Sequence, residues 1–211
     1  IWGVNMSKTL LEIQNEYNFS TDKNTWHSYL NTYEHLFNRF TDSNIKLFEI
    51  GVLAGESLKL WSKYLPQSEI YGCDIFTRVS FEDVERNLVS FNNIFLAGID
   101  SFNEDNASVG SRDDFLNEVE DKMFHIIIDD GHHDSISQIK TFNNFIHKLH
   151  PDGVYVIEDI KDWDGHLENV KEQLPDVKIV KLKSNMGNDH NDNILGVYSK
   201  DESFYEGLEY E

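Results

Sequence analysis

The stretch Phe124-His-Ile-Ile-Ile-Asp-Asp-Gly-His-His-Asp134 decides the fold. Its first part, Phe124–Ile128, is mostly apolar and β-branched, which is typical of a strand buried on both faces of a parallel sheet. The residues that follow are carboxylates, a glycine and imidazoles. In open α/β sheets ligands bind just beyond the carboxyl ends of the strands, so a functional site is expected at this point.

A second stretch has the same character. Val154-Tyr-Val-Ile-Glu-Asp-Ile160 is another buried-strand pattern, and it ends in Glu158 and Asp159. If the two strands are neighbours in a parallel sheet, their carboxyl ends meet at one edge. The sequence then predicts that Asp130, His133, Glu158 and Asp159 converge on a small volume.

Strand and helix patterns alternate from residue 45 onward, which predicts βαβ units and a doubly wound, mostly parallel sheet. The last two strands are joined by a loop without a helix, so we expect them to pair antiparallel. Residues 7 to about 44 are expected to form a helical cover, because their apolar residues lie at helical spacing. Within this segment a helix is expected from Trp26 to Phe40. The predicted organisation is an N-terminal helical cap over residues 1–44 and one compact domain over 45–211. The expected strands are 45–50, 69–74, 93–98, 124–128, 154–160, 177–182 and 193–199. Pro151-Asp-Gly153 is expected to form a turn into the fifth strand.

Composition limits the class of protein. The 211 residues include 39% hydrophobic and 13% aromatic side chains, which fits one folded domain. The formal charge of −20 repels phosphate backbones, so a nucleic acid partner is not expected. Cys73 is the single cysteine, which favours a reducing compartment, and no apolar run is long enough to span a membrane. The expectation is a cytoplasmic protein without membrane attachment.

A glycine-containing loop, Glu49-Ile-Gly-Val-Leu-Ala-Gly-Glu-Ser57, joins the first expected strand to its helix. Gly51 and Gly55 allow a tight turn and a close approach to a ligand, and the helix N-terminus favours an anion. Leu53 stands where a dinucleotide fingerprint requires glycine, so the loop fits a nucleotide better than NAD. The alternative is that these glycines only make a turn.

Acidic residues follow the next two strands. Asp74 ends the second strand, where an acid can accept both hydroxyls of a ribose. Asp100 follows the third strand and is a candidate contact to an adenine amine. The candidate cofactor-binding residues are Glu49, Gly51, Gly55, Ser57, Asp74, Asp100 and Asp129.

With these motifs the chain resembles the class I S-adenosylmethionine-dependent methyltransferases, whose Rossmann-like sheet carries an antiparallel last strand. Within that superfamily it is similar to the metal-dependent sugar O-methyltransferases of macrolide biosynthesis and to the cephalosporin-hydroxylase-like group. The shared features are Thr21-Asp-Lys23 with His27, Tyr29 and Tyr33-Glu34, then Asp129-Asp-Gly-x-His133, and Val156-Ile-Glu-Asp159.

The resemblance implies S-adenosylmethionine and Mg²⁺ as cofactors and a hydroxylated small molecule, best a sugar, as acceptor. It implies Asp130, Glu158 and Asp159 as magnesium ligands and His133 as general base. The residue chemistry is compatible, because carboxylates suit a hard cation and an imidazole can take a proton from a hydroxyl near neutrality. His132 departs from the family pattern, in which that position is usually small, and Glu56 stands where glycine is common.

Other interpretations remain open from the sequence. His132 or His133 with a carboxylate would suit iron in an oxygenase, and the chain would also suit a non-catalytic nucleotide-binding module. In a purely structural interpretation, Asp129, Asp130 and Asp134 are turn and cap residues. His27 and Tyr29 either line a pocket or pack as ordinary amphipathic residues, and the aromatic N-terminal helices offer a surface for a homo-oligomer. His166 and the polar stretch Asn185–Asn193 are further candidates near the site, without an assigned role.

Overall fold

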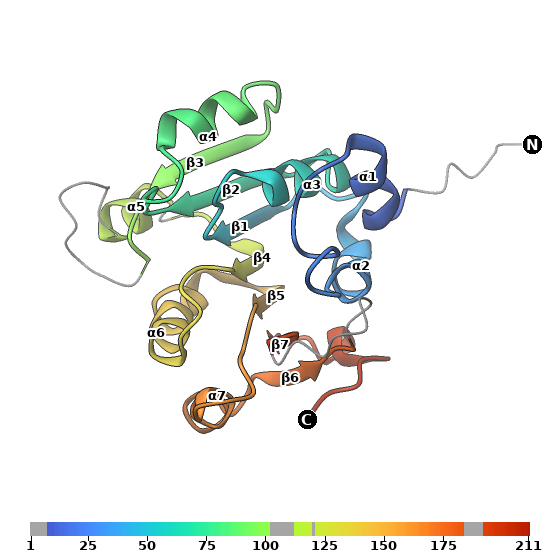
Figure 1. Cartoon of the computed structure of the whole chain (residues 1–211), viewed down its shortest axis with the longest axis vertical. Coiled ribbons are helices and arrows are strands. Elements are labelled where there is room, and N and C mark those ends of the chain that lie inside the picture. The colour runs from blue at the N-terminus through green and yellow to red at the C-terminus, as the bar shows by residue number, and fades with distance from the viewer. Residues whose placement is uncertain (1–7, 102–111, 120, 184–191) are drawn as a thin grey trace, which may run out of the picture.

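The computed structural model describes residues 8–101, 112–119, 121–183 and 192–211. It contains a seven-stranded sheet in the order β3-β2-β1-β4-β5-β7-β6, which fans across the molecule from β3 to β6 (Figure 1). The strands are β1 (Lys46–Ile50), β2 (Glu69–Asp74), β3 (Ile94–Gly98), β4 (Phe124–Asp129), β5 (Leu149–Ile157), β6 (Lys178–Lys181) and β7 (Ile194–Tyr198).

Strand directions agree with the predicted doubly wound topology. The pairs β3·β2, β2·β1, β1·β4 and β4·β5 are parallel. β7 runs antiparallel to both of its neighbours, β5 and β6. The prediction of a seven-stranded, mostly parallel sheet with an antiparallel last strand is therefore confirmed.

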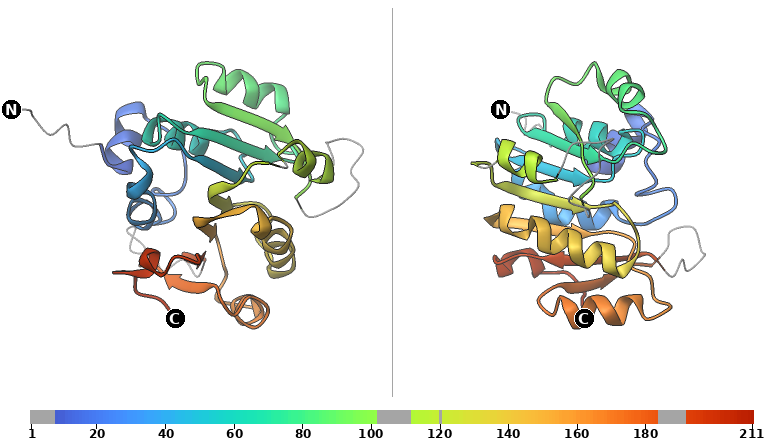
Figure 2. Two further views of the ribbon diagram at one scale, coloured as in Figure 1. Left: turned by 180° about the vertical axis from the view of Figure 1, so that it is seen from behind. Right: turned by 90° about the vertical axis from the view of Figure 1, so that its left-hand side faces the viewer.

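Helices cover both faces of the sheet (Figure 2). None of the helices in the described ranges has both the length and the apolar run that a membrane span needs. They are α1 (Leu10–Tyr17), α2 (Leu30–Phe37), α3 (Glu56–Tyr64), α4 (Phe81–Leu88), α5 (Arg112–Glu118), α6 (Ser135–Phe145) and α7 (His166–Gln173), with short 3₁₀ turns at Asn38–Phe40, Ile146–Lys148 and Glu202–Tyr205.

Two hydrophobic cores follow from the alternation of side chains along the buried strands. Ile126 and Ile128 of β4 lie in one core, together with residues of the N-terminal helices such as Leu10 and Phe37. Ile127 lies in the other core, with residues of α6 and α7. Because β4 is buried on both sides, its sequence is a continuous apolar run.

The N-terminal segment is less helical than its aromatic spacing suggests. α1 begins at a capping box formed by Thr9 and Glu12, and the chain leaves the helix at Asn18 in the left-handed conformation. α2 begins only at Leu30, so the expectation of a helix from Trp26 is wrong, and Trp26 is 55% exposed in a turn. The irregular segment between α1 and α2 reaches the carboxyl edge of the sheet.

A second difference concerns residues 151–153, which were expected to form a turn before the fifth strand. They lie inside β5, where the pairing shifts from Phe124↔Leu149 to Ile126↔Val154. Proline and glycine are tolerated in a strand at such an irregularity. The turn signal therefore marks a bulge.

Candidate active site

The carboxyl ends of β1, β4 and β5 meet at one edge of the sheet. Asp129, the last residue of β4, is in register with Ile50 of β1 and Ile157 of β5. The backbone N–H of Glu158 donates to the carbonyl of Asp129 at 2.9 Å, which extends the pairing by one residue. Asp130, Glu158 and Asp159 therefore leave the sheet side by side, as the sequence predicted.

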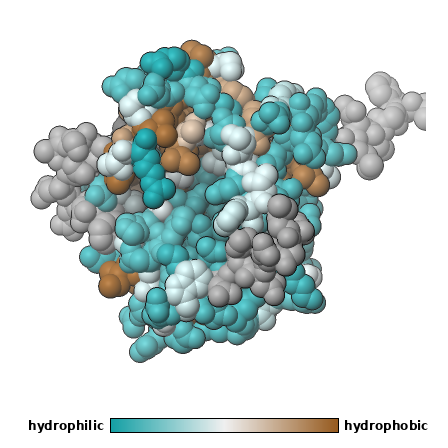
Figure 3. All heavy atoms as spheres, in the orientation of Figure 1, coloured by the Kyte–Doolittle hydropathy of each residue, from teal (hydrophilic) through white to brown (hydrophobic). Residues whose placement is uncertain are grey.

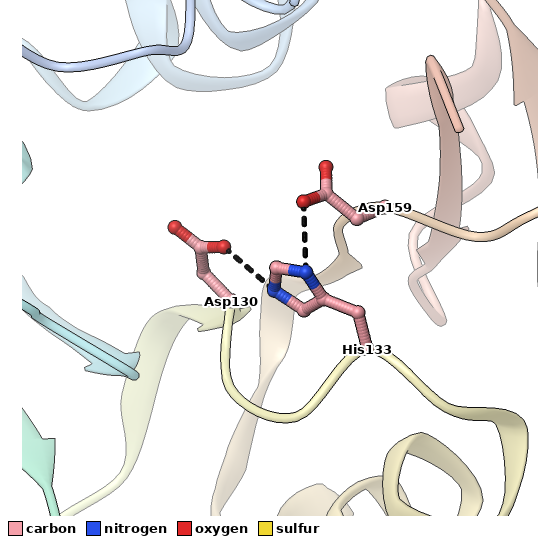
Figure 4. Close-up of side chains that lie close together, drawn as sticks. All are labelled: Asp130, His133 and Asp159. Atoms are coloured by element: carbon pink, nitrogen blue, oxygen red, sulfur yellow. Dashed lines mark hydrogen bonds and ion pairs between the residues drawn. The ribbon is translucent and has the colours of Figure 1, made fainter. Parts of the chain in front are cut away.

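One group of side chains, which we call the outer cluster, consists of Asp130, His133 and Asp159 (Figure 4). His133 Nε2 lies 3.2 Å from Asp130 Oδ1, and His133 Nδ1 lies 3.0 Å from Asp159 Oδ2. Both ring nitrogens thus face carboxylate oxygens. The ligand atoms of the three residues lie within 4.8 Å of one another, a spacing that a single ion could bridge.

The imidazole of His133 is strongly influenced by these neighbours. Burial lowers its pKa, but the hydrogen bond to Asp130 and the charges of Asp159, Asp130 and Asp129 outweigh burial and raise the pKa to about 9. The Lys161 ammonium donates to the His133 carbonyl at 2.6 Å and fixes the loop that carries the ring.

The inner cluster consists of Lys23, Glu49, Asp130 and Glu158. Lys23 Nζ lies 2.6 Å from Glu158 Oε1, 2.8 Å from Asp130 Oδ2 and 3.5 Å from Glu49 Oε1, and the lysine is fully buried. Burial lowers the pKa of Lys23, but the charges of Asp130, Glu158 and Glu49 reverse this and leave it well above 10.5. Burial and then repulsion from Asp130 raise the pKa of Glu158, and the Lys23 ammonium opposes that shift.

Glu49 lies beneath the glycine loop. Its Oε2 accepts hydrogen bonds from Ser57 Oγ at 2.9 Å and Trp61 Nε1 at 3.1 Å, and the side chain is 0% exposed. Burial raises its pKa to about 7, which Lys23 partly offsets. Glu49 is thus part of the inner cluster, and Ser57 connects it to the first turn of α3.

Two tyrosines from the N-terminal segment complete the site. Tyr29 Oη donates to Asp159 Oδ1 at 2.6 Å, and Tyr33 Oη donates to Glu158 Oε1. His27 stacks on the Tyr29 ring, and its Nε2 lies 3.5 Å from Asp159 Oδ1. Tyr29 therefore packs in the core, as the second alternative expects, and its hydroxyl contacts Asp159 from within the core.

His166 lies behind the site. Gln138 Nε2 donates to the Glu158 carbonyl at 2.8 Å, so the Gln138 Oε1 atom is the acceptor for His166 Nε2 at 2.7 Å. Burial and then the charge of Lys161 lower the pKa of His166. This neutral ring supports the backbone at Glu158.

The glycine loop is held by Asp74. Asp74 Oδ2 accepts from the backbone N–H groups of Val52 at 2.9 Å and Leu53 at 3.0 Å, and Oδ1 accepts from Phe76 at 2.9 Å. Gly51 has a φ of +85°, and a Cβ there would lie 2.1 Å from the Asp130 carbonyl oxygen. The loop after β1 thus packs directly on the loop after β4, and only glycine allows this approach.

A cavity of about 780 Å³ connects these parts. Figure 3 shows this face of the molecule, with a hydrophilic centre and hydrophobic surface gathered above it. The cavity is lined by residues of the glycine loop, of the segments that follow β2, β3 and β4, and of the N-terminal segment. Representative residues are Thr21, Gly51, Ser57, Asp74, Ser101, Asp130, His133 and Lys161.

The predicted cofactor-binding residues occupy different depths. Gly51, Ser57 and Asp74 line the cavity, whereas Asp129 is buried beneath it at 1% exposure. Asp129 Oδ1 accepts from the Gly131 N–H at 3.2 Å, Oδ2 has no hydrogen-bond partner, and burial raises its pKa to about 7. Gly55 is the N-cap residue of α3 and lies between the lining residues Ala54 and Glu56, and Asp100 lies between the lining residues Ile99 and Ser101.

The predicted metal ligands are divided between the clusters. Asp130 belongs to both, Asp159 to the outer and Glu158 to the inner one. His132 lies apart, with a side chain that is 75% exposed and paired with Asp134 at 3.0 Å. Asp134 also caps α6. The stretch Asn185–Asn193 lies outside the described residues except for its last two, of which Asp192 has its carbonyl oxygen 3.0 Å from Tyr29 Oη.

Comparison with known proteins gives the relationship. Over 152 residues the chain is 30% identical to the 8-demethyl-8-(2-methoxy-alpha-L-rhamnosyl)-tetracenomycin-C 3'-O-methyltransferase of Streptomyces olivaceus, which covers 67% of this chain and 34% of that protein. Over 145 residues it is 25% identical to the mycinamicin VI 2''-O-methyltransferase of Micromonospora griseorubida, covering 64% of this chain and 31% of that protein. No family model matches the chain.

Solved structures show which fold the chain shares. The MycE methyltransferase from the mycinamycin biosynthetic pathway, in complex with Mg, SAH and mycinamycin VI, superposes with a TM-score of 0.66 at 23% identity, covering 93% of this chain and 56% of that chain. This chain has the class I methyltransferase fold, and about two thirds of it is similar in sequence to sugar O-methyltransferases. A putative caffeoyl-CoA O-methyltransferase from Staphylococcus aureus shares the methyltransferase fold, with a TM-score of 0.57 at 14% identity over 89% of this chain and 88% of that one. The chain spans about a third of the length of the curated relatives it matches.

Proposed function

We propose that this chain carries out methyl transfer from S-adenosylmethionine to a hydroxyl of a sugar or sugar-bearing small molecule, assisted by Mg²⁺. The observation that carries the proposal is that one cavity has the glycine loop and Asp74 on one side and Asp130 with His133 on the other. The relatives named above, which are sugar O-methyltransferases, support the acceptor class.

The glycine loop and the residues after β2 and β3 form the side of the cavity that we assign to the cofactor. Gly51 lines the cavity and lets the loop after β1 pack against the backbone of Asp130, and Asp74 lines the cavity at the end of β2. We assign Asp74 to the ribose hydroxyls and Asp100 to the adenine amine. Ser57 donates to Glu49 beneath the glycine loop, and Asp129 accepts from Gly131 in the loop after β4, so these residues support the two loops that border the cavity.

The donor set fits a hard divalent cation. Asp130, Glu158 and Asp159 supply carboxylate oxygens at one edge of the sheet, and oxygen ligands are those that Mg²⁺ prefers. Glu49 Oε1 and Asp129 Oδ2 are buried nearby without a hydrogen-bond partner. Asp130, Glu158 and Asp159 would hold the ion, which would lower the pKa of an acceptor hydroxyl.

His133 is the proposed general base. Its ring lines the cavity between Asp130 and Asp159, where it can reach the proton of a hydroxyl that enters from the cavity. With its pKa raised to about 9 by these carboxylates, the ring is protonated at neutral pH in the arrangement described. The base role therefore needs the two carboxylates to be neutralised by a cation.

Calorimetric titration with S-adenosylmethionine and S-adenosylhomocysteine, with and without Mg²⁺, tests the proposal. We expect micromolar binding of both compounds. Asp130→Asn should lose the response of methyl transfer to Mg²⁺, whereas Asp152→Asn, an exposed carboxylate near His150 at the opposite end of β4 and β5, should keep it. No binding of either compound would overturn the assignment of the loop, and an unchanged magnesium titration in Asp130→Asn would overturn the ligand assignment.

Homo-oligomerisation and a cytoplasmic location stay predictions.

A further inference from the structure

Asp130 has cationic groups on two sides. Its Oδ1 faces His133 at 3.2 Å in the outer cluster, and its Oδ2 faces Lys23 at 2.8 Å in the inner cluster. The two clusters share this one carboxylate. Each is spaced so that one ion could bridge its ligand atoms, which lie within 4.8 Å of one another in both cases.

The inner position is already filled. The ammonium of Lys23 is within 4 Å of a carboxylate oxygen from each of Glu49, Asp130 and Glu158. An ammonium has three N–H donors and no acceptor, so it matches a pocket of carboxylate oxygens. Lys23 is 0% exposed, and a buried charge of this kind is stable only when it is paired.

The backbone around Lys23 is fixed from several directions. The Tyr29 N–H donates to the Lys23 carbonyl at 2.9 Å, and Gln14 Nε2 donates to the Thr21 carbonyl at 3.1 Å. Just upstream, the Ser20 N–H donates to Glu56 Oε2 at 3.1 Å, which ties the segment to the first turn of α3. The segment that carries Lys23 is therefore held in place by hydrogen bonds. It positions the ammonium among carboxylates that are remote in sequence.

We propose that Lys23 is a positioning residue of this site: its ammonium is the resident cation of the inner cluster and restricts the divalent ion to the side of Asp130 that faces His133 and Asp159. Lys23 holds one oxygen each of Asp130 and Glu158, and the other oxygen of Asp130 faces His133 on the side left for the divalent ion. Glu49 then neutralises Lys23 and is not a metal ligand. This inference rests on the proposed magnesium-dependent function.

Counting bound Mn²⁺ ions by electron paramagnetic resonance tests the assignment, with Mn²⁺ alone as the probe. The wild-type chain should bind one ion. Lys23→Met keeps an unbranched side chain but removes the ammonium, so a second Mn²⁺ should bind among Glu49, Asp130 and Glu158. The double variant Lys23→Met with Glu49→Gln should lose that second ion. Lys148→Met is the matched control, because Lys148 is also buried but its Nζ donates to the Val119 carbonyl at 2.9 Å.

A Lys23→Met chain that still binds one ion with unchanged affinity would overturn the assignment. If Lys23→Met does not fold, Glu49→Gln alone decides. We expect its Mn²⁺ dissociation constant to match that of the wild type, since Glu49 lies on the Lys23 side. A weakening of about tenfold or more, as expected when a group that supports a metal is removed, would place the ion in the inner cluster and overturn the inference. A wild-type chain that binds no Mn²⁺ would instead overturn the magnesium part of the proposed function, and this inference with it.

Discussion

The two ends of β4 carry histidines with opposite properties. His133, beyond the carboxyl end, lies between Asp130 and Asp159, and its pKa is raised to about 9. His125, at the amino end, stacks on His150 with ring centroids 4.2 Å apart. Burial, then the charges of His150 and Lys46, lower its pKa to about 4.

The difference shows how topology assigns roles to similar residues. At the carboxyl edge the loops of parallel strands diverge, which leaves room for a cavity and gathers the side chains that follow each strand. At the amino edge His125 packs against His150 and Phe40, and its Nδ1 is buried without a hydrogen-bond partner. One histidine is therefore surrounded by charge and the other by rings.

The largest expected effect tests this contrast directly. His133→Ala should lower the rate of methyl transfer by about 10²–10⁴-fold, the usual contribution of a general base, while S-adenosylmethionine still binds. His125→Ala should change turnover little, because that ring is at the opposite end of the strand from the cavity. Initial rates with labelled S-adenosylmethionine and a panel of glycoside acceptors measure both variants. Full activity in His133→Ala would remove it as the base.

A smaller effect, on the free energy of unfolding, should distinguish two glycines that both have the left-handed conformation. Gly51 and Gly165 both have positive φ, +85° and +71°, but only Gly51 has backbone in the way, with the Asp130 carbonyl oxygen 2.1 Å from an added Cβ. Gly165→Ala should lower the free energy of unfolding by about 1–2 kcal/mol through backbone strain alone. Gly51→Ala should cost more, because the β1 and β4 loops must separate.

Urea unfolding of the two variants beside the wild type makes this comparison. A loss in Gly51→Ala no larger than that in Gly165→Ala would show that the close approach of the two loops is not required. A larger loss, together with weaker S-adenosylhomocysteine binding, would show that the same contact holds both the fold and the site.

The sequence predicts the carboxyl-edge chemistry because it depends on local patterns. The apolar runs of β4 and β5 are continuous, and parallel strands end at one edge, so Asp130, Glu158 and Asp159 are expected together. The turn expected at residues 151–153 was wrong because proline and glycine mark bulges as well as turns. Local patterns also indicate the antiparallel β6·β7 pair, since no helix separates the two strands.

Lys23 could not be assigned a role in the same way. It lies 107 residues before Asp130 and 135 before Glu158, so no local pattern links them. Tyr29 and Tyr33 follow the spacing of a buried helical face, which predicts that their rings pack in the core. That spacing gives no indication that their hydroxyls contact Asp159 and Glu158. The sequence did contain one signal for these residues. The motif from Thr21 to Glu34 is shared with the family that the chain resembles, but the motif does not give the role of each residue.

The smallest expected effect concerns the amino end of β4 and the pH dependence of stability. Because the pKa of His125 is about 4 in the folded chain and near 6.5 when unfolded, the unfolded chain takes up the proton first as pH falls. The stability that neutral His125 contributes is complete above pH 6.5 and is lost between 6.5 and about 4. His125→Phe keeps the ring and removes the titration, so the wild type should lose more stability than this variant across that interval. Chemical unfolding of both chains at a series of pH values measures the free energy of unfolding. The two chains share the same carboxylates, so carboxylate titration cancels in the difference between them. Parallel curves would mean that His125 is as easily protonated in the fold as in the unfolded chain, and the contrast between the two ends of β4 would then rest on His133 alone.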